Sequence, residues 1–152
     1  MSTQRRVLEL VAPFAGTVVA LEDLPDPVYA AGVVGPGLAV RPDPDARRVT
    51  VCAPCDGLVH ATLPHAVMLI AGHGRQVLVH LGVQVVDHEV SELGRVGERV
   101  RAGERLLVWD VRGSGSALAS PVVALQAPRA QVLAVVEPGD RVAVGQPLLF
   151  WS

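Results

Sequence analysis

The sequence predicts an all-β protein, an antiparallel β-sandwich or barrel of many short strands with short helical turns. Half of its 152 residues are hydrophobic but only 3% are aromatic, so the core must be mainly aliphatic. Glycine and proline occur at 15 and 12 positions, and turn signals at this density are typical of antiparallel sandwiches and barrels. Helical turns are indicated only at residues 26–32 and 128–139. The length fits one domain, 1–152, with residues 1–8 as a short tail.

Two internal repeats set the order of strands and turns. The pattern A-P-x-x-G-x-V occurs at Ala12–Val18 and again at Ala53–Val59. A longer unit occurs as GERVRAGERLLVW at Gly97–Trp109 and as GDRVAVGQPLLFW at Gly139–Trp151. Each longer unit supplies a glycine turn, a short apolar strand, a second glycine turn and a terminal strand. We expect both copies to fold in the same way.

An apolar strand is predicted at Gly74–Val86 (GRQVLVHLGVQVV), with His80 near its centre. Alternation gives this strand one aliphatic and one mixed face. The aliphatic face consists of Val77, Val79, Leu81, Val83 and Val85. The mixed face consists of Gln76, Leu78, His80, Gly82 and Gln84. Because Gly82 has no side chain, the strand can hold the His80 imidazole with open space beside it.

The same strand is expected to be the second half of a hairpin. Residues 65–82 run up, turn at Ala71–Arg75 and return, which brings His65 close to His80. The histidines to which we assign no role are His60, His73 and His88.

Charge and hydropathy exclude several classes of function. The net charge is −2 without blocks of like charge, so neither nucleic acid nor an anionic membrane is indicated as a partner. No apolar run is long enough to span a membrane, and Glu9 and Pro13 interrupt the start too early for a signal peptide. We expect a cytoplasmic protein.

The cysteine pair Cys52 and Cys55 forms a CxxC pattern. A redox motif would need a following helix, and a zinc site would need a second cysteine pair. The intervening and following residues read instead as a turn. We therefore expect two ordinary small side chains here, and no metal.

Repeated glycine-turn units of this kind resemble three families: lipoyl and biotinyl carrier domains, glucose-type enzyme IIA, and LytM-type zinc endopeptidases. Carrier domains need a lysine for their cofactor, and all 13 basic residues of this chain are arginine. The endopeptidases need an HxxxD motif followed by HxH, because their zinc requires converging ligands. Neither motif occurs, so enzyme IIA remains.

The strand around His80 resembles the phosphorylation signature of glucose-type enzyme IIA of the sugar phosphotransferase system. That signature is a glycine, two residues, three aliphatics, the active histidine, an aliphatic, a glycine and further aliphatics. The positions that fit are Gly74, Val77, Leu78, Val79, His80, Leu81, Gly82, Val83 and Val86. Segments 21–42, 53–59 and 120–125 also have counterparts in the family, so the resemblance covers nearly the whole chain.

The resemblance implies a duplicated hybrid motif, or barrel-sandwich, and a phosphoryl relay that needs no cofactor. Family members accept a phosphoryl group from the carrier protein HPr and pass it to a cysteine on the IIB domain of a sugar permease. The matching positions make His80 the nucleophile and His65 its partner. A neutral imidazole suits this role, because its unperturbed pKa is about 6.5.

An apolar docking patch with an acidic edge is also implied around His80. The matching positions are Asp26, Tyr29, Val67, Leu78, Gly82 and Val86. Three positions depart from the family: Leu63 and Val85 stand where threonine is usual, and Gln84 stands where many members have an acidic residue. The stretch 85–100 also differs from the usual one.

These departures leave a second hypothesis open. The chain would then be a regulatory module that keeps the fold and binds target proteins through the same face, but transfers no phosphoryl group.

Overall fold

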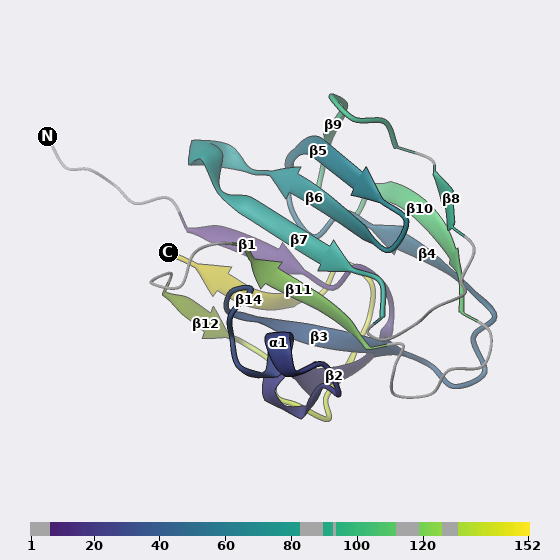
Figure 1. Ribbon diagram of the computed structural model, residues 1–152, viewed down its shortest axis with the longest axis vertical. Coiled ribbons are helices and arrows are strands. Elements are labelled where there is room, and N and C mark those ends of the chain that lie inside the picture. Colours follow the sequence, from purple (N-terminus) through teal and green to yellow (C-terminus); the bar gives the residue numbers. More distant parts are fainter. Residues whose placement is uncertain (1–6, 83–89, 93, 112–118, 126–130) are drawn as a thin grey trace, which may run out of the picture.

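The computed structural model describes residues 7–82, 90–92, 94–111, 119–125 and 131–152. Most elements in these segments are β-strands, and their strand pairs are antiparallel. The strands form one eight-stranded sheet and two three-stranded sheets (Figure 1). The predicted all-β class is confirmed.

The large sheet carries the candidate site. Its strands, in spatial order, are β13 (Arg141–Val142), β2 (Gly16–Ala20), β3 (Gly37–Pro42), β11 (Ser120–Ala124), β7 (Gln76–His80), β6 (Ala66–Ile70), β5 (Gly57–Leu63) and β9 (Arg99–Val100). The small sheets are β1 (Leu8–Val11), β14 (Pro147–Trp151) and β12 (Val132–Ala134), and β4 (Arg48–Cys52), β10 (Arg105–Asp110) and β8 (Val90–Glu92). The short helices are η1 (Leu21–Asp23), α1 (Pro27–Ala30) and η2 (Gly72–Gly74).

The sequence repeats form two equivalent halves. The A-P-x-x-G-x-V motifs lead into β2 and β5, and the longer units form β13 and β14 in one half and β9 and β10 in the other. The order of the large sheet reads the same from either end when β13 is exchanged for β9, β2 for β5, β3 for β6 and β11 for β7. A pseudo-twofold axis therefore passes between β11 and β7.

Reciprocal backbone hydrogen bonds join the two halves. The Val11 N–H donates to the carbonyl of Pro54, and the Cys52 N–H donates to the carbonyl of Pro13, both at 2.8 Å. Each proline thus accepts from the strand that precedes the other motif. The expectation that both repeats fold alike is confirmed.

The glycine of each A-P-x-x-G-x-V motif permits close approach of the next strand. A Cβ atom on Gly16 would lie 2.1 Å from the Arg41 carbonyl oxygen, and one on Gly57 would lie 2.6 Å from the Ile70 carbonyl oxygen. Both distances are far below van der Waals contact. The repeated glycine therefore reflects the packing of β2 on β3 and of β5 on β6.

Two hydrophobic clusters stabilise the fold. The main core lies between the sheets and is largely aliphatic, as predicted, although Trp109 is also fully buried and its ring centroid lies 6.3 Å from that of Phe14. Within it, Val77, Val79 and Leu81 confirm the aliphatic face of the His80 strand. A smaller cluster lies on the outer face of the large sheet, against η1 and α1.

The helical expectations have opposite outcomes. Residues 26–32 contain α1, whose first turn is capped by Asp26, because its Oδ1 accepts from the Val28 N–H at 2.9 Å. The expectation for 128–139 is wrong where the chain is described, because Val132–Ala134 is the strand β12. It pairs with β14, so sheet pairing overrides a weak local helical preference. No described helix has the length and apolar character needed to cross a membrane.

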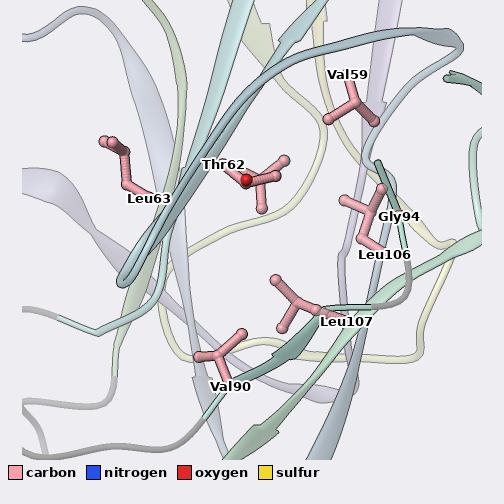
Figure 2. Close-up of a pocket in the computed structure, with 8 residues that line it drawn as sticks. Val59, Thr62, Leu63, Val90, Gly94, Leu106 and Leu107 are labelled. Atoms are coloured by element: carbon pink, nitrogen blue, oxygen red, sulfur yellow. The ribbon is translucent and has the colours of Figure 1, made fainter. Parts of the chain in front are cut away.

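A narrow apolar cleft opens between the large sheet and the sheet of β4, β10 and β8 (Figure 2). Its lining residues are Val59, Thr62, Leu63, Val67, Val90, Gly94, Leu106 and Leu107. Gly94 lies at the edge of this lining, and a Cβ atom there would lie 3.6 Å from Leu106 O and 3.9 Å from Leu106 Cδ2. These are ordinary contact distances, so the cleft has room for an added methyl group.

We expect Gly94→Ala to raise the free energy of unfolding by about 0.4–1 kcal/mol, because alanine restricts the unfolded chain without straining the native one. Gly103→Ala is the matched control, since Gly103 has a φ of +84° and alanine there should lower stability by a similar amount or more. Denaturant unfolding of both variants measures the difference. Equal effects of the two substitutions would contradict this description of Gly94.

Candidate functional site

His80 ends β7 on the outer face of the large sheet. Its backbone pairs with Ala66 of β6, and strand alternation turns its ring away from the main core that Val79 enters. The imidazole is half-buried. The strand therefore holds the ring at the surface with little freedom of the backbone.

His65 is exposed and lies in the tight turn between β5 and β6. Its carbonyl accepts a hydrogen bond from the Leu81 N–H at 2.7 Å, which continues the β6–β7 ladder past His80. The ring centroids of His65 and His80 lie 5.0 Å apart with an interplanar angle of 54°. The predicted hairpin and its turn at residues 71–75 are confirmed, and they bring the two imidazoles into contact.

A hydrogen bond to the backbone sets the tautomer of His80. The Nδ1 atom is hydrogen-bonded to the carbonyl oxygen of Gly82. A carbonyl oxygen only accepts, so Nδ1 carries the proton and Nε2 of the neutral ring keeps its lone pair. Gly82 is buried and has a φ of +70°, a conformation that glycine adopts without strain. The hydrogen bond therefore favours the tautomer in which Nε2 carries the lone pair.

Tyr29 supports the other side of the His80 ring. Its ring meets His80 edge to face, with centroids 5.4 Å apart, and only 5% of the residue is exposed. Burial, followed by the negative charge of Asp26, raises the pKa of Tyr29 to about 12. The phenol is therefore neutral at physiological pH and adds no charge beside the imidazole.

Tyr29 and His65, the two neighbours of the His80 ring, come from equivalent connections of very different length. Between β5 and β6 the chain needs only residues 64–65, whereas between the equivalent strands β2 and β3 it runs through residues 21–36, which include η1 and α1. His65 lies in the first connection and Tyr29 in the second.

The predicted docking residues have mixed outcomes. The prediction that Val67 belongs to the docking surface is wrong. Val67 pairs with Val79, and both side chains point into the main core, so only 2% of Val67 is exposed. Leu78 shares the face of His80 but is covered in the outer cluster, as is Tyr29. Asp26 is half-buried as the cap of α1. Val86, together with Gln84 and Val85, lies outside the described residues.

Sequence reasoning did not predict three exposed aliphatic residues that lie close in sequence to Tyr29 or His65. Val28 in α1 is 48% exposed, Val33 just after it is 75% exposed, and Leu63 before the His65 turn is 48% exposed. Their neighbours in sequence, Tyr29 and His65, contact His80. For Val28 and Val33, the signal in the sequence is an apolar residue in or next to a helix of a single turn, which is too short to cover it.

Cys52 and Cys55 are free thiols with buried side chains. Burial, followed by the negative charge of Asp56, raises the pKa of Cys55 to about 12, and burial raises that of Cys52. Both therefore remain protonated near neutral pH, as structural cysteines do. Among the described residues no three His, Cys, Asp or Glu side chains are grouped to hold a metal ion.

The fold class is shared with a solved structure, glucose permease IIA from Mycoplasma capricolum. The two superpose with a TM-score of 0.76 over 99% of each chain, at 22% sequence identity. The likeness shows the all-β enzyme IIA fold. The family model for EIIA 1 of the phosphoenolpyruvate-dependent sugar phosphotransferase system matches residues 8–131. The chain therefore belongs to that family, and the resemblance seen in its sequence is confirmed.

Curated relatives agree with this membership. The chain is 33% identical to the glucose-specific EIIA component of Bacillus cereus over 128 residues, which cover 75% of this chain and 72% of that protein. It is 35% identical to the mannose-specific EIIBCA component of Corynebacterium glutamicum over 130 residues, or 77% of this chain and 18% of that protein. A third relative, the N-acetylglucosamine-specific EIICBA component of Klebsiella pneumoniae, is 33% identical over 97% of this chain and 23% of that protein. The chain thus spans about a fifth of these two multidomain relatives.

Tyr29 is the only tyrosine, so tyrosinate absorbance reports its ionisation alone. We expect the native protein to titrate near pH 12, and the guanidinium-unfolded chain near the ordinary value of about 10. Because the native pKa is the higher one, its stabilising effect is complete below pH 10 and is lost as the pH rises toward 12. A native midpoint near 10, with circular dichroism unchanged, would contradict the burial of Tyr29.

Proposed function

We propose that this chain is a phosphocarrier that accepts a phosphoryl group from phospho-HPr on His80 and passes it to a IIB cysteine for sugar uptake. The observation that carries the proposal is the His80 tautomer. Nδ1 donates a hydrogen bond to the Gly82 carbonyl, so the lone pair on Nε2 is the group that accepts the phosphoryl group. Membership in the EIIA 1 family supports the same role.

The transfer chemistry needs only this imidazole and its neighbours. In the first step the Nε2 lone pair bonds to phosphorus as the P–N bond to the HPr histidine breaks, and that histidine keeps the electron pair. In the second step a IIB cysteine thiolate bonds to phosphorus as the P–Nε2 bond breaks, and His80 regains its lone pair. The Gly82 carbonyl stabilises the positive charge that develops on the ring.

His65 has the position of a phosphoryl-binding partner. Its ring centroid is 5.0 Å from that of His80, so one of its N–H groups can donate to an oxygen of a phosphoryl group on Nε2. Charge on these oxygens must be met by donors if the group is to be held and released. We therefore assign His65 to the transfer step. No nucleotide, metal ion or other cofactor enters the proposal.

We propose a docking surface around the imidazoles that consists of the exposed residues Val28, Val33 and Leu63 and the acidic cap Asp26. Val86 remains a prediction from its position in the sequence. Gly82 is buried, so it enters the proposal through its hydrogen bond to His80 and not as a surface contact. An apolar patch with a charged rim is the usual composition of such an interface. The covered residues Leu78 and Tyr29 of the outer cluster shape the surface from beneath, whereas Val67 faces the main core.

Intact mass after incubation with phosphoenolpyruvate, enzyme I and HPr tests the assignment of the histidines. The wild type should gain one acid-labile phosphoryl group, and His80→Ala should gain none. His65→Ala should still accept the group but pass it to a IIB domain poorly, because its donor is lost. His73→Ala is the control, since His73 is exposed at the η2 tip.

Two outcomes would count against the proposal. Labelling of His80→Ala would show another acceptor. An unlabelled wild type, with HPr itself phosphorylated, would favour the alternative function, a regulatory module that binds target proteins without transferring a phosphoryl group.

The docking surface predicts a loss of affinity for phospho-HPr without a loss of chemistry. Val28→Ser should raise KM for phospho-HPr about tenfold, equivalent to ~1.4 kcal/mol of contact energy, and leave kcat unchanged. Val144→Ser is the matched control, because Val144 is 50% exposed and Val28 is 48% exposed. Steady-state transfer rates give both constants. Equal KM values for the two variants would remove Val28 from the surface.

A further inference from the structure

Ser120 is a buried polar residue beside the site to which the phosphocarrier mechanism assigns no role. It begins β11 and is 0% exposed, the single polar or charged side chain in the described segments with this degree of burial. Its Oγ accepts a hydrogen bond from the Gly82 N–H at 3.0 Å. Buried hydroxyl groups are costly unless bonded, so this contact is a built feature of the fold.

Gly82 therefore has hydrogen bonds on both sides. Its N–H donates to Ser120 Oγ, and its carbonyl accepts from His80 Nδ1. These two groups belong to successive peptide planes, so together they fix both backbone dihedral angles of Gly82. A glycine without such bonds has more conformational freedom than any other residue.

The Ser120 hydroxyl lies just beyond the end of the backbone pairing between β11 and β7. The pairing of β11 with β7 extends from Ala124 opposite Val77 to Val122 opposite Val79. Beyond that pair, the Gly82 N–H donates its hydrogen bond to the Ser120 side chain of β11 instead of to a backbone carbonyl. Pro121 follows Ser120 and restricts its backbone to an extended conformation, and the hydrogen bond from Gly82 gives the position of its hydroxyl oxygen.

We propose that Ser120 is a positioning residue that fixes the tautomer and orientation of His80 through the Gly82 peptide. The inference rests on the proposed phosphocarrier function. Without the Ser120 hydroxyl, the Gly82 carbonyl is free to turn from Nδ1, and the neutral ring can carry its proton on Nε2. That tautomer has no lone pair on Nε2 for the incoming phosphorus.

The test compares Ser120→Ala and Ser120→Thr by two measurements. Long-range ¹H–¹⁵N spectra of the imidazoles report the tautomer of His80, and transfer kinetics from phospho-HPr report its reactivity. Ser120→Ala should shift His80 to a mixture of tautomers and lower kcat about tenfold, with KM unchanged. Ser120→Thr keeps the hydroxyl and should restore both. Val122→Ala is the packing control, because Val122 is a buried β11 residue of the main core and its loss should leave the tautomer intact.

A wild-type tautomer and kcat in Ser120→Ala would overturn the inference, and so would failure of Ser120→Thr to restore them. If Ser120→Ala does not fold, Ser120→Cys replaces it, because the thiol has a similar size and accepts hydrogen bonds weakly. A wild type that takes no phosphoryl group would refute the proposed function alone. The spectra would still decide whether Ser120 sets the tautomer.

Discussion

Two hydrogen bonds, from Val11 N–H to Pro54 O and from Cys52 N–H to Pro13 O, hold the two halves of the molecule in register. Proline has no N–H of its own, so at each motif only the carbonyl is available, and it accepts from the opposite half. The neighbouring glycines then let β2 and β5 approach β3 and β6 closely. These reciprocal hydrogen bonds fix the point at which β2 and β5 begin, and the large sheet and the main core are built on those two strands.

The candidate site uses the face that this core leaves outside. One side of the β7 ladder is committed to the main core, so the other side is available for His80. The outer cluster packs η1 and α1 on that face and places the Tyr29 ring against His80. The turn before β6 supplies His65. The main core and the two imidazoles thus lie on opposite faces of the sheet, and the imidazoles share their face with the smaller outer cluster.

The sequence predicts the features that depend on local period and repetition. Strand alternation around His80, the hairpin that brings His65 near it, and the duplication of turns are readable because each leaves a regular pattern of residues. Burial from distant elements leaves no such pattern. The family position predicts Val67 in the docking patch, whereas the pairing of β6 with Val79 turns its side chain inward. The cover on Leu78 and the strand β12 depend on contacts with α1 and β14. Local patterns predict these two elements but not what they pack against.

The unequal connections between equivalent strands have a structural consequence. In a duplicated scaffold the shared parts are constrained twice, since Gly16 and Gly57 meet the same steric demand in both halves. The connections 21–36 and 64–65 carry no such double constraint. The two connections can therefore differ in length and in residue type although the strands that they join are equivalent. One connection supplies Tyr29 and the other His65, and both rings meet at His80, so a symmetric framework holds an asymmetric cluster of side chains.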